Sequence, residues 1–441
     1  MRNQNRSAKK ALGLFTLLGW GIALHAQSSD ALIDKLVQKG ILTVKEANEL
    51  RDETDKNFSL AHAVKTGLPD WVASLRFNGD IRLRYDHITN VDPSAIDRDR
   101  FRYRLRFGYT AVLLDDWEVG FAFASGQNDP VSTNQTLDDN AVKKPVTLDK
   151  VYARWTPVNK GPWLVNTTLG KMEQPLAFPS TLLFDNDYMP EGLAQEVSFK
   201  LTSKHSLKAT GVAFVLDEVA ASSRDPYLLG GQLRWDAEWS PKWHSSAGVT
   251  HLSIVNGANL VNGAVPDISG GNTRLGPTGV PAYSYNTLYL DGALTYKLDK
   301  FPLYEGAFPI TVSGDFTRNS SAPANNLGYS VGLTLGKAGK KKLWELNWRY
   351  TELQADAWYE ELVESDFGAF YKTAAPGTPA TAIGYRSGTN VRGHWIKGTY
   401  NVYDSFSFSI AYFLTDLINE PGLAPYDSGS GRLFLEGIWK F

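Results

Sequence analysis

The chain has 441 residues, a formal net charge of −2 and no cysteine. The lack of cysteine excludes a disulfide framework and a thiolate metal site, and the near-neutral charge gives no reason to expect a nucleic-acid partner. No cofactor is expected either, because the histidines are scattered without the spacing of metal ligands.

The first 26 residues are predicted to be an export signal. A basic stretch with two Arg and two Lys precedes an apolar core from Ala11 to Leu24, and we expect cleavage after Ala26. This core is shorter than the ~20 apolar residues of a membrane-spanning helix. No later stretch is long and apolar enough, so an exported protein that stays in a membrane must cross it with strands.

Residues 27–70 are predicted to form a periplasmic helical segment and linker. The apolar side chains of Leu32, Ile33, Leu36 and Val37 fall on one helical face, and Thr43 to Glu46 fits a capping box. Two interpretations remain open, a helical hairpin that rests against the rest of the protein and an oligomerisation segment.

From Leu75 onward the hydrophobic period changes to two. Within 75–87 the odd positions are mainly apolar or aromatic, while the even positions are polar or charged. The segment 101–113 repeats the pattern, with apolar and aromatic residues alternating with arginines. Because successive side chains of a strand point to opposite faces, one face is apolar and the other must reach water.

The pattern continues to the end of the chain and predicts a closed antiparallel outer-membrane β-barrel over residues 71–441. Candidate strands of about 10 residues with aromatic ends suit a bilayer better than a soluble sandwich, and short turns alternate with long loops. The sixteen predicted strands are 75–87, 99–114, 117–125, 147–156, 163–172, 192–202, 207–217, 228–239, 243–255, 284–298, 308–318, 327–337, 343–353, 391–402, 406–416 and 431–441. A missed hairpin would raise the count to eighteen; either number leaves an aqueous channel.

The last predicted strand places Leu435, Trp439 and Phe441 on one apolar face. A closing strand with a terminal aromatic resembles the signal that the outer-membrane barrel-assembly machinery reads. We therefore expect these three residues to act as an assembly signal.

Several segments resemble the bacterial "putative porin" family. They are Arg102 to Gly108, Asp115 to Trp117, Asn128 to Thr136 and Gly170 to Leu193. The segment from Ala31 to Thr43 is similar to the N-terminal segment of that family and of phosphate- and polyphosphate-selective porins. The resemblance implies an outer-membrane barrel and a diffusion pore, but not phosphate selectivity.

Two sets of charged residues are the candidate functional residues. The predicted pore-lining set is Arg76, Arg82, Arg84, Arg100, Arg102, Arg104 and Arg106. The predicted constriction loop is the third long loop and carries Glu173, Asp185, Asp187 and Glu191. Guanidinium groups stay charged and bind carboxylates, so an acidic loop opposite this wall would set a transverse field. The alternatives are local neutralisation by Asp80, Asp86, Glu118 or a loop, and an external loop that caps the barrel.

These observations predict a porin for passive diffusion of small hydrophilic solutes or ions, with a weak preference for anions and no enzymatic activity. The expected partners are outer-membrane lipid, the assembly machinery, small solutes and other copies of the chain in a trimer. The alternative function is a structural or anchoring barrel whose helical segment binds cell wall or partner proteins.

Overall fold

The computed structural model describes residues 68–93, 95–260, 270–275, 279–371, 385–420 and 427–441. The predicted export signal and almost all of the predicted helical segment lie outside these residues. The chain divides into two units, 1–74 and 75–441. No helix in the described ranges combines the length and the apolar character that a bilayer crossing requires.

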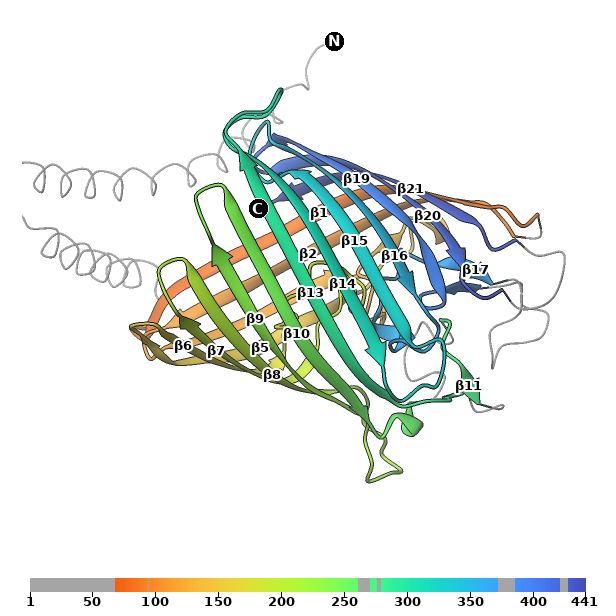
Figure 1. The fold of residues 1–441 in the computed structure, drawn as a ribbon, viewed down its shortest axis with the longest axis horizontal. Coiled ribbons are helices and arrows are strands. Elements are labelled where there is room, and N and C mark those ends of the chain that lie inside the picture. Colours follow the sequence, from red (N-terminus) through yellow and green to blue (C-terminus); the bar gives the residue numbers. More distant parts are fainter. Residues whose placement is uncertain (1–67, 94, 261–269, 276–278, 372–384, 421–426) are drawn as a thin grey trace, which may run out of the picture. The chain divides into compact units, whose positions relative to one another are not determined.

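Sixteen antiparallel strands form a closed barrel (Figure 1). The strands are β1 (Val72–Asn90), β2 (Arg98–Leu113), β3 (Trp117–Ser125), β5 (Val146–Lys160), β6 (Trp163–Lys171), β7 (Glu191–Lys200), β8 (His205–Val215), β9 (Tyr227–Glu238), β10 (Trp243–Val255), β13 (Tyr285–Leu298), β14 (Phe308–Asn319), β15 (Leu327–Gly336), β16 (Trp344–Leu353), β19 (Val391–Tyr403), β20 (Phe406–Leu417) and β21 (Ser430–Lys440). Each strand pairs with its neighbour, and β21 returns to β1 with Leu435 opposite Tyr85.

The predicted count of sixteen is confirmed, and the alternative of eighteen is wrong. The remaining short elements lie in the loops: strand β4 (Gln135–Thr136), which pairs with β2, the hairpins β11 (Arg274–Leu275) with β12 (Val280–Pro281) and β17 (Ala369–Tyr371) with β18 (Tyr385–Ser387), and the 3-10 turns η1 (Asp139–Ala141), η2 (Gly257–Asn259) and η3 (Glu360–Leu362). None of these adds a strand that crosses the barrel.

The outer surface of the barrel is apolar and ends in aromatic pairs. On β1, Leu83 is 51% exposed while its neighbour Arg84 is 6% exposed. At the end with short turns, the rings of Trp163 and Phe199 lie 4.4 Å apart. Amphipathic rings at the end of an apolar band are typical of a strand barrel that spans a bilayer.

Long loops at the opposite end fold into the barrel and fill part of its interior. The loop between β6 and β7 buries Leu183 and Phe184 against wall residues that include Phe214 and Tyr285. In the loop between β16 and β19, Trp358 is fully buried in the same cluster. Apolar packing of this kind fixes the course of a loop, because the buried rings are removed from water. The loops therefore have a defined place inside the barrel.

Candidate functional site

Seven arginines from three adjacent strands form what we call the basic wall. They are Arg82 and Arg84 of β1, Arg100, Arg102, Arg104 and Arg106 of β2, and Arg432 of β21. The alternation of strand side chains directs all of them to the inner face. Their side chains are between 4% and 28% exposed, so acids must compensate much of their charge.

Two aspartates of β1 lie within the wall. Asp80 accepts hydrogen bonds from Arg104 Nη2 at 2.6 Å and from Arg106 Nε at 3.0 Å. Asp86 accepts from Arg432 Nε and Nη2, both at 3.0 Å, and also pairs with Arg100. Asp80 therefore ties β1 to β2, and Asp86 ties β1 to both β2 and β21.

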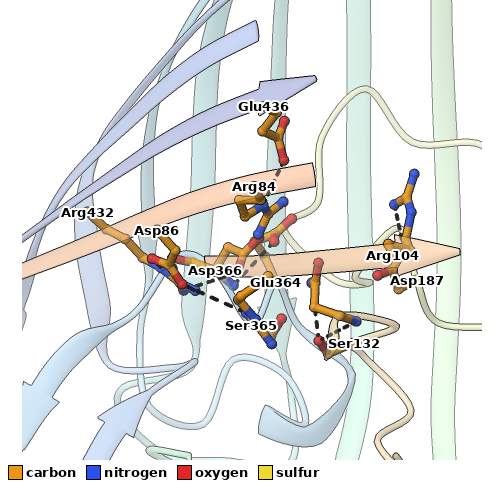
Figure 2. Close-up of polar contacts among 12 residues, drawn as sticks. Arg84, Asp86, Arg104, Ser132, Asp187, Glu364, Ser365, Asp366, Arg432 and Glu436 are labelled. Atoms are coloured by element: carbon orange, nitrogen blue, oxygen red, sulfur yellow. Dashed lines mark hydrogen bonds and ion pairs between the residues drawn. The ribbon is translucent and has the colours of Figure 1, made fainter. Parts of the chain in front are cut away.

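Glu436 of β21 contacts three basic side chains. Its Oε1 lies 2.7 Å from Arg84 Nε and 3.5 Å from Arg82 Nη1, and its Oε2 lies 3.7 Å from Lys397 Nζ. The hydroxyl of Ser409 also donates to Oε2 at 2.9 Å. Figure 2 shows Glu436 next to Arg84 on the inner face.

The loop between β6 and β7 crosses the interior and touches walls on two sides. On one side, the Gln232 side chain exchanges hydrogen bonds with the backbone of Ala177, each at 2.9 Å, and Arg349 donates to the carbonyl of Pro179 at 2.8 Å. On the other, Asp187 Oδ1 lies 3.3 Å from Arg106 Nη1. The carboxylate of Asp187 therefore contacts the basic wall directly.

The loop between β16 and β19 also folds inward and reaches the basic wall. Asp366 lies 3.1 Å from Arg84 Nη1 and 3.1 Å from Arg432 Nη1 (Figure 2). Next to it, the backbone N–H of Ser365 donates to Asp185 Oδ2 at 2.9 Å. The two inward loops therefore meet each other beside the arginines.

Four carboxyl groups gather at this junction of the two loops: Asp185, Asp187, Glu364 and Asp366. Burial, together with the nearby carboxyl of Asp366, raises the pKa of Glu364 to about 7. Burial and Glu364 also raise the pKa of Asp185 well above its usual range. For Asp366 burial acts in the same sense, but Arg432 and Arg84 prevail and hold its pKa well below the ordinary value. The junction therefore combines carboxyls that resist ionisation with one that is firmly ionised.

A cavity of about 600 Å³ remains between the inward loops and the barrel wall. Arg82, Arg84, Arg104 and Arg106 line one side of it, and rings that include Trp395 line another. Its lining includes six basic residues (Arg82, Arg84, Arg104, Arg106, Arg349 and Lys397) and six acidic ones (Asp185, Asp187, Glu345, Glu364, Asp366 and Glu436), of which Asp185 and Glu364 resist ionisation.

The structure divides the predicted arginine set. Arg82, Arg84, Arg104 and Arg106 line the cavity, whereas Arg100 and Arg102 pair with Asp86 and lie outside its lining. Arg76 lies nearer the start of β1, is exposed and also lies outside the lining. Of the acids considered as neutralising partners, Asp80, Asp86 and the loop contact the arginines, while Glu118 pairs with Arg154.

The predicted loop acids are divided as well. Asp185 and Asp187 are carried inward, but Glu173 pairs with Lys150 and Glu191 pairs with Lys171, with 70% and 62% of their side chains exposed. Glu173 and Glu191 flank the loop at the strand ends, where the chain has not yet turned into the barrel.

Several residues of the site were not predicted. Arg432 and Glu436 occupy even positions of the last strand, so the same alternation that marks the arginines of β1 could have found them. Glu364 and Asp366 belong to a long loop without periodicity, and no local signal marks them. Lys397 is one of two basic residues, with Arg392, on β19.

Within the ranges that the structure describes, no group of three or more His, Asp or Glu side chains is arranged to bind a metal. His205 and His244 lie at the end with short turns, whereas His251 and His394 lie on the outer face. The site is therefore one of ion pairs and apolar contacts between loops and wall.

Residues 88–256 match the family described as "Putative porin", which is less than half of the chain. No curated protein matches in sequence. Among solved structures, the chain is similar to Pseudomonas putida OprB at high pH, with 11% identity, a TM-score of 0.49 and coverage of 86% of this chain and 97% of that one. It is also similar to a triple mutant of the Rhodopseudomonas blastica porin, with 8% identity, a TM-score of 0.42 and coverage of 83% and 100%. The barrel fold rests on the strand pairing, and the similarity to the family is confined to residues 88–256.

Proposed function

We propose that this chain is an outer-membrane porin that lets small hydrophilic solutes or ions diffuse passively through a water-filled path. The observation that carries the proposal is the closed barrel of sixteen strands with an apolar outside and a charged inside. Barrels of this size are wide enough for an aqueous channel. The family match over residues 88–256 supports the same function.

The path runs along the basic wall, because the inward loops fill much of the remaining interior. The cavity of about 600 Å³ lies there, between the loops and strands β1, β2, β16 and β19 to β21. Charged groups that line a narrow passage set ion preference. We propose that the pore weakly prefers anions, although equal numbers of acidic and basic groups line the cavity.

The proposed partners are outer-membrane lipid, the barrel-assembly machinery, small solutes and other copies of the chain in a trimer. The last strand bears on assembly: Trp439 and Phe441 are 41% and 50% exposed on its outer face, where another protein or lipid can contact them. Leu435 lies on the same face.

Ion conductance tests the proposal directly. The purified chain, reconstituted in a planar lipid bilayer, is expected to give stepwise current increases in 1 M KCl, and proteoliposomes are expected to swell in small sugars. A barrel that folds and inserts but gives no current steps would contradict the pore. That outcome would favour the anchoring function, which the packing of loops inside the barrel makes a concrete alternative.

A further inference from the structure

The cavity beside the basic wall has an apolar side that a polar channel does not require. The inner faces of porin-type strands are normally polar, yet Trp395, Phe413 and Phe434 follow one another across β19, β20 and β21. Phe413 and Phe434 are only 6% and 2% exposed, because Phe367 of the inward loop and the guanidinium groups of the wall cover them. Trp395 is partly exposed and lines the cavity. Of these three rings, Trp395 is therefore the one that a solute in the cavity can contact.

Near Trp395, three basic side chains of the cavity lining contact one and the same carboxylate. Arg82, Arg84 and Lys397 share the single carboxylate of Glu436. Arg84 has a second acid in Asp366, but among the described residues Arg82 and Lys397 have no other acid within ion-pair distance. Arg82 Nη2 donates to Asn134 Oδ1 at 2.5 Å, while Arg82 Nε is buried without a hydrogen-bond partner among the described residues. A buried guanidinium that is not fully bonded is costly, so an anion at this point would be stabilised.

The cations and the ring are also placed to act together. Arg82 and Lys397 approach the two different oxygens of one carboxylate, which brings them within reach of one further small anion. Lys397 follows Trp395 by two positions on β19, so both side chains leave the same face of the strand. The cavity volume of about 600 Å³ lies within the range of small-molecule sites.

We propose that this part of the cavity is a subsite for a small carboxylate with a flat apolar ring, an aromatic monocarboxylate. Its carboxylate bonds Arg82 and Lys397, and its ring stacks on Trp395. The proposal rests on the porin function above and adds the class of solute. A neutral ring would leave the cations unsatisfied, a cation would be repelled, and a carboxylate without a ring would leave Trp395 in water.

Benzoate is the probe that tests the subsite on the full-length protein. In planar bilayers we expect benzoate to reduce the ion current at concentrations about tenfold lower than acetate, since stacking adds to the charge contact. Benzyl alcohol and benzylammonium, which carry the ring without the negative charge, are expected to block only weakly.

Variants assign the effect to the three side chains. Arg82→Gln and Lys397→Gln are each expected to raise the benzoate concentration for half-block by about tenfold, because each loses a charged hydrogen bond. Trp395→Ala is expected to raise it roughly three- to tenfold, and Trp395→Phe, which keeps a ring, to restore most of the block. Lys342→Gln, in the exposed turn between β15 and β16, is the matched control and should leave the block unchanged.

Benzoate binding to the detergent-solubilised protein, measured by saturation-transfer NMR, separates the two proposals. Current steps without benzoate binding, or equal block by acetate and benzoate, would overturn the subsite and leave the porin. Benzoate binding that Trp395→Ala weakens, in a protein without current steps, would overturn the porin and leave the subsite. Block that is indifferent to all three side chains would place benzoate elsewhere and contradict the proposal.

Discussion

At the scale of single residues, Leu83 and Arg84 are neighbours whose side chains meet opposite surroundings. Leu83 is 51% exposed on the outer face, and Arg84 is 6% exposed among carboxylates on the inner face. Because successive side chains of a strand point to opposite faces, these two lie on opposite sides of the barrel wall. A single substitution can therefore test which face meets lipid.

Leu83→Arg is expected to destabilise the inserted barrel by about 2–4 kcal/mol, because a charge near the bilayer midplane loses its hydration. The measurement is the urea midpoint of refolding into lipid vesicles, with the folded form identified by its heat-modifiable migration. Leu303→Arg is the control, since Leu303 is 93% exposed in the turn between β13 and β14. Equal losses for the two variants would show that Leu83 does not face lipid.

At the scale of elements, each of the two inward loops is bonded to the barrel wall, and the loops also contact each other. The loop between β6 and β7 is bonded to β9 and β16 at Ala177 and Pro179 and to β2 at Asp187. The loop between β16 and β19 is bonded to β1 and β21 at Asp366. Where they meet, Asp185 is buried and Glu364 is partly buried, and burial raises the pKa of both carboxyls.

The docking of these loops is expected to weaken as the pH rises through about 7. Glu364 has a pKa of about 7 in the folded protein, above its ordinary value of 4.5. A carboxyl whose folded pKa is raised stabilises the docked state fully below the ordinary pKa, and this stability is lost as the pH rises through the folded pKa. The ionised group then faces Asp187 and Asp366, and the nearby Arg84 is already bonded to Asp366 and Glu436.

Single-channel recordings between pH 5 and pH 8.5 check this expectation. Current fluctuations should increase toward pH 8.5 in the original protein, and Glu364→Gln, which mimics the protonated form, should keep the low-pH behaviour throughout. Glu305→Gln, in an exposed turn, is the control. If Glu364→Gln retains the full pH dependence, another group is responsible.

At the scale of the whole molecule, closure of the barrel concentrates charge around one passage. Seven arginines lie on three adjacent strands that meet where β21 returns to β1. Asp80, Asp86, Asp187, Asp366 and Glu436 compensate them. In the proposed pore, ion selectivity depends on the difference between these opposing charges, and we expect a few substitutions to reverse it.

Replacing Arg102, Arg104 and Arg106 together by Ser is expected to move the reversal potential in a salt gradient toward cation preference. The change removes three cations and leaves Asp80 and Asp187 uncompensated beside the cavity. The shift should fade toward 1 M salt, where the screening length is about 3 Å.

The matched control removes three cations far from the wall, at Lys340, Lys341 and Lys342 in the turn between β15 and β16. This control should leave the reversal potential nearly unchanged. A triple arginine variant that opens normally with an unmoved reversal potential would mean that the arginines only hold the loops and strands in place.

The strands, their number and the inner position of the arginines other than Arg76 could be predicted from the sequence, because all three follow from a local rule. Successive strand residues alternate between faces, so a run such as 101–113 carries its own orientation. The predicted strand 243–255 coincides with β10, and the predicted 75–87 lies within β1. The same rule extends to Arg432 and Glu436 on the last strand.

Only the tertiary structure decided which acids meet the arginines and how the loops run. Asp187 reaches Arg106 while Glu173 of the same loop stays outside, and Asp366 arrives from a loop about 280 residues away from Arg84 along the chain. Such loops have no periodicity, and their course is set by packing of rings such as Trp358 against distant strands. Local pattern determines which face of a strand a side chain takes, whereas long-range packing determines what that side chain meets.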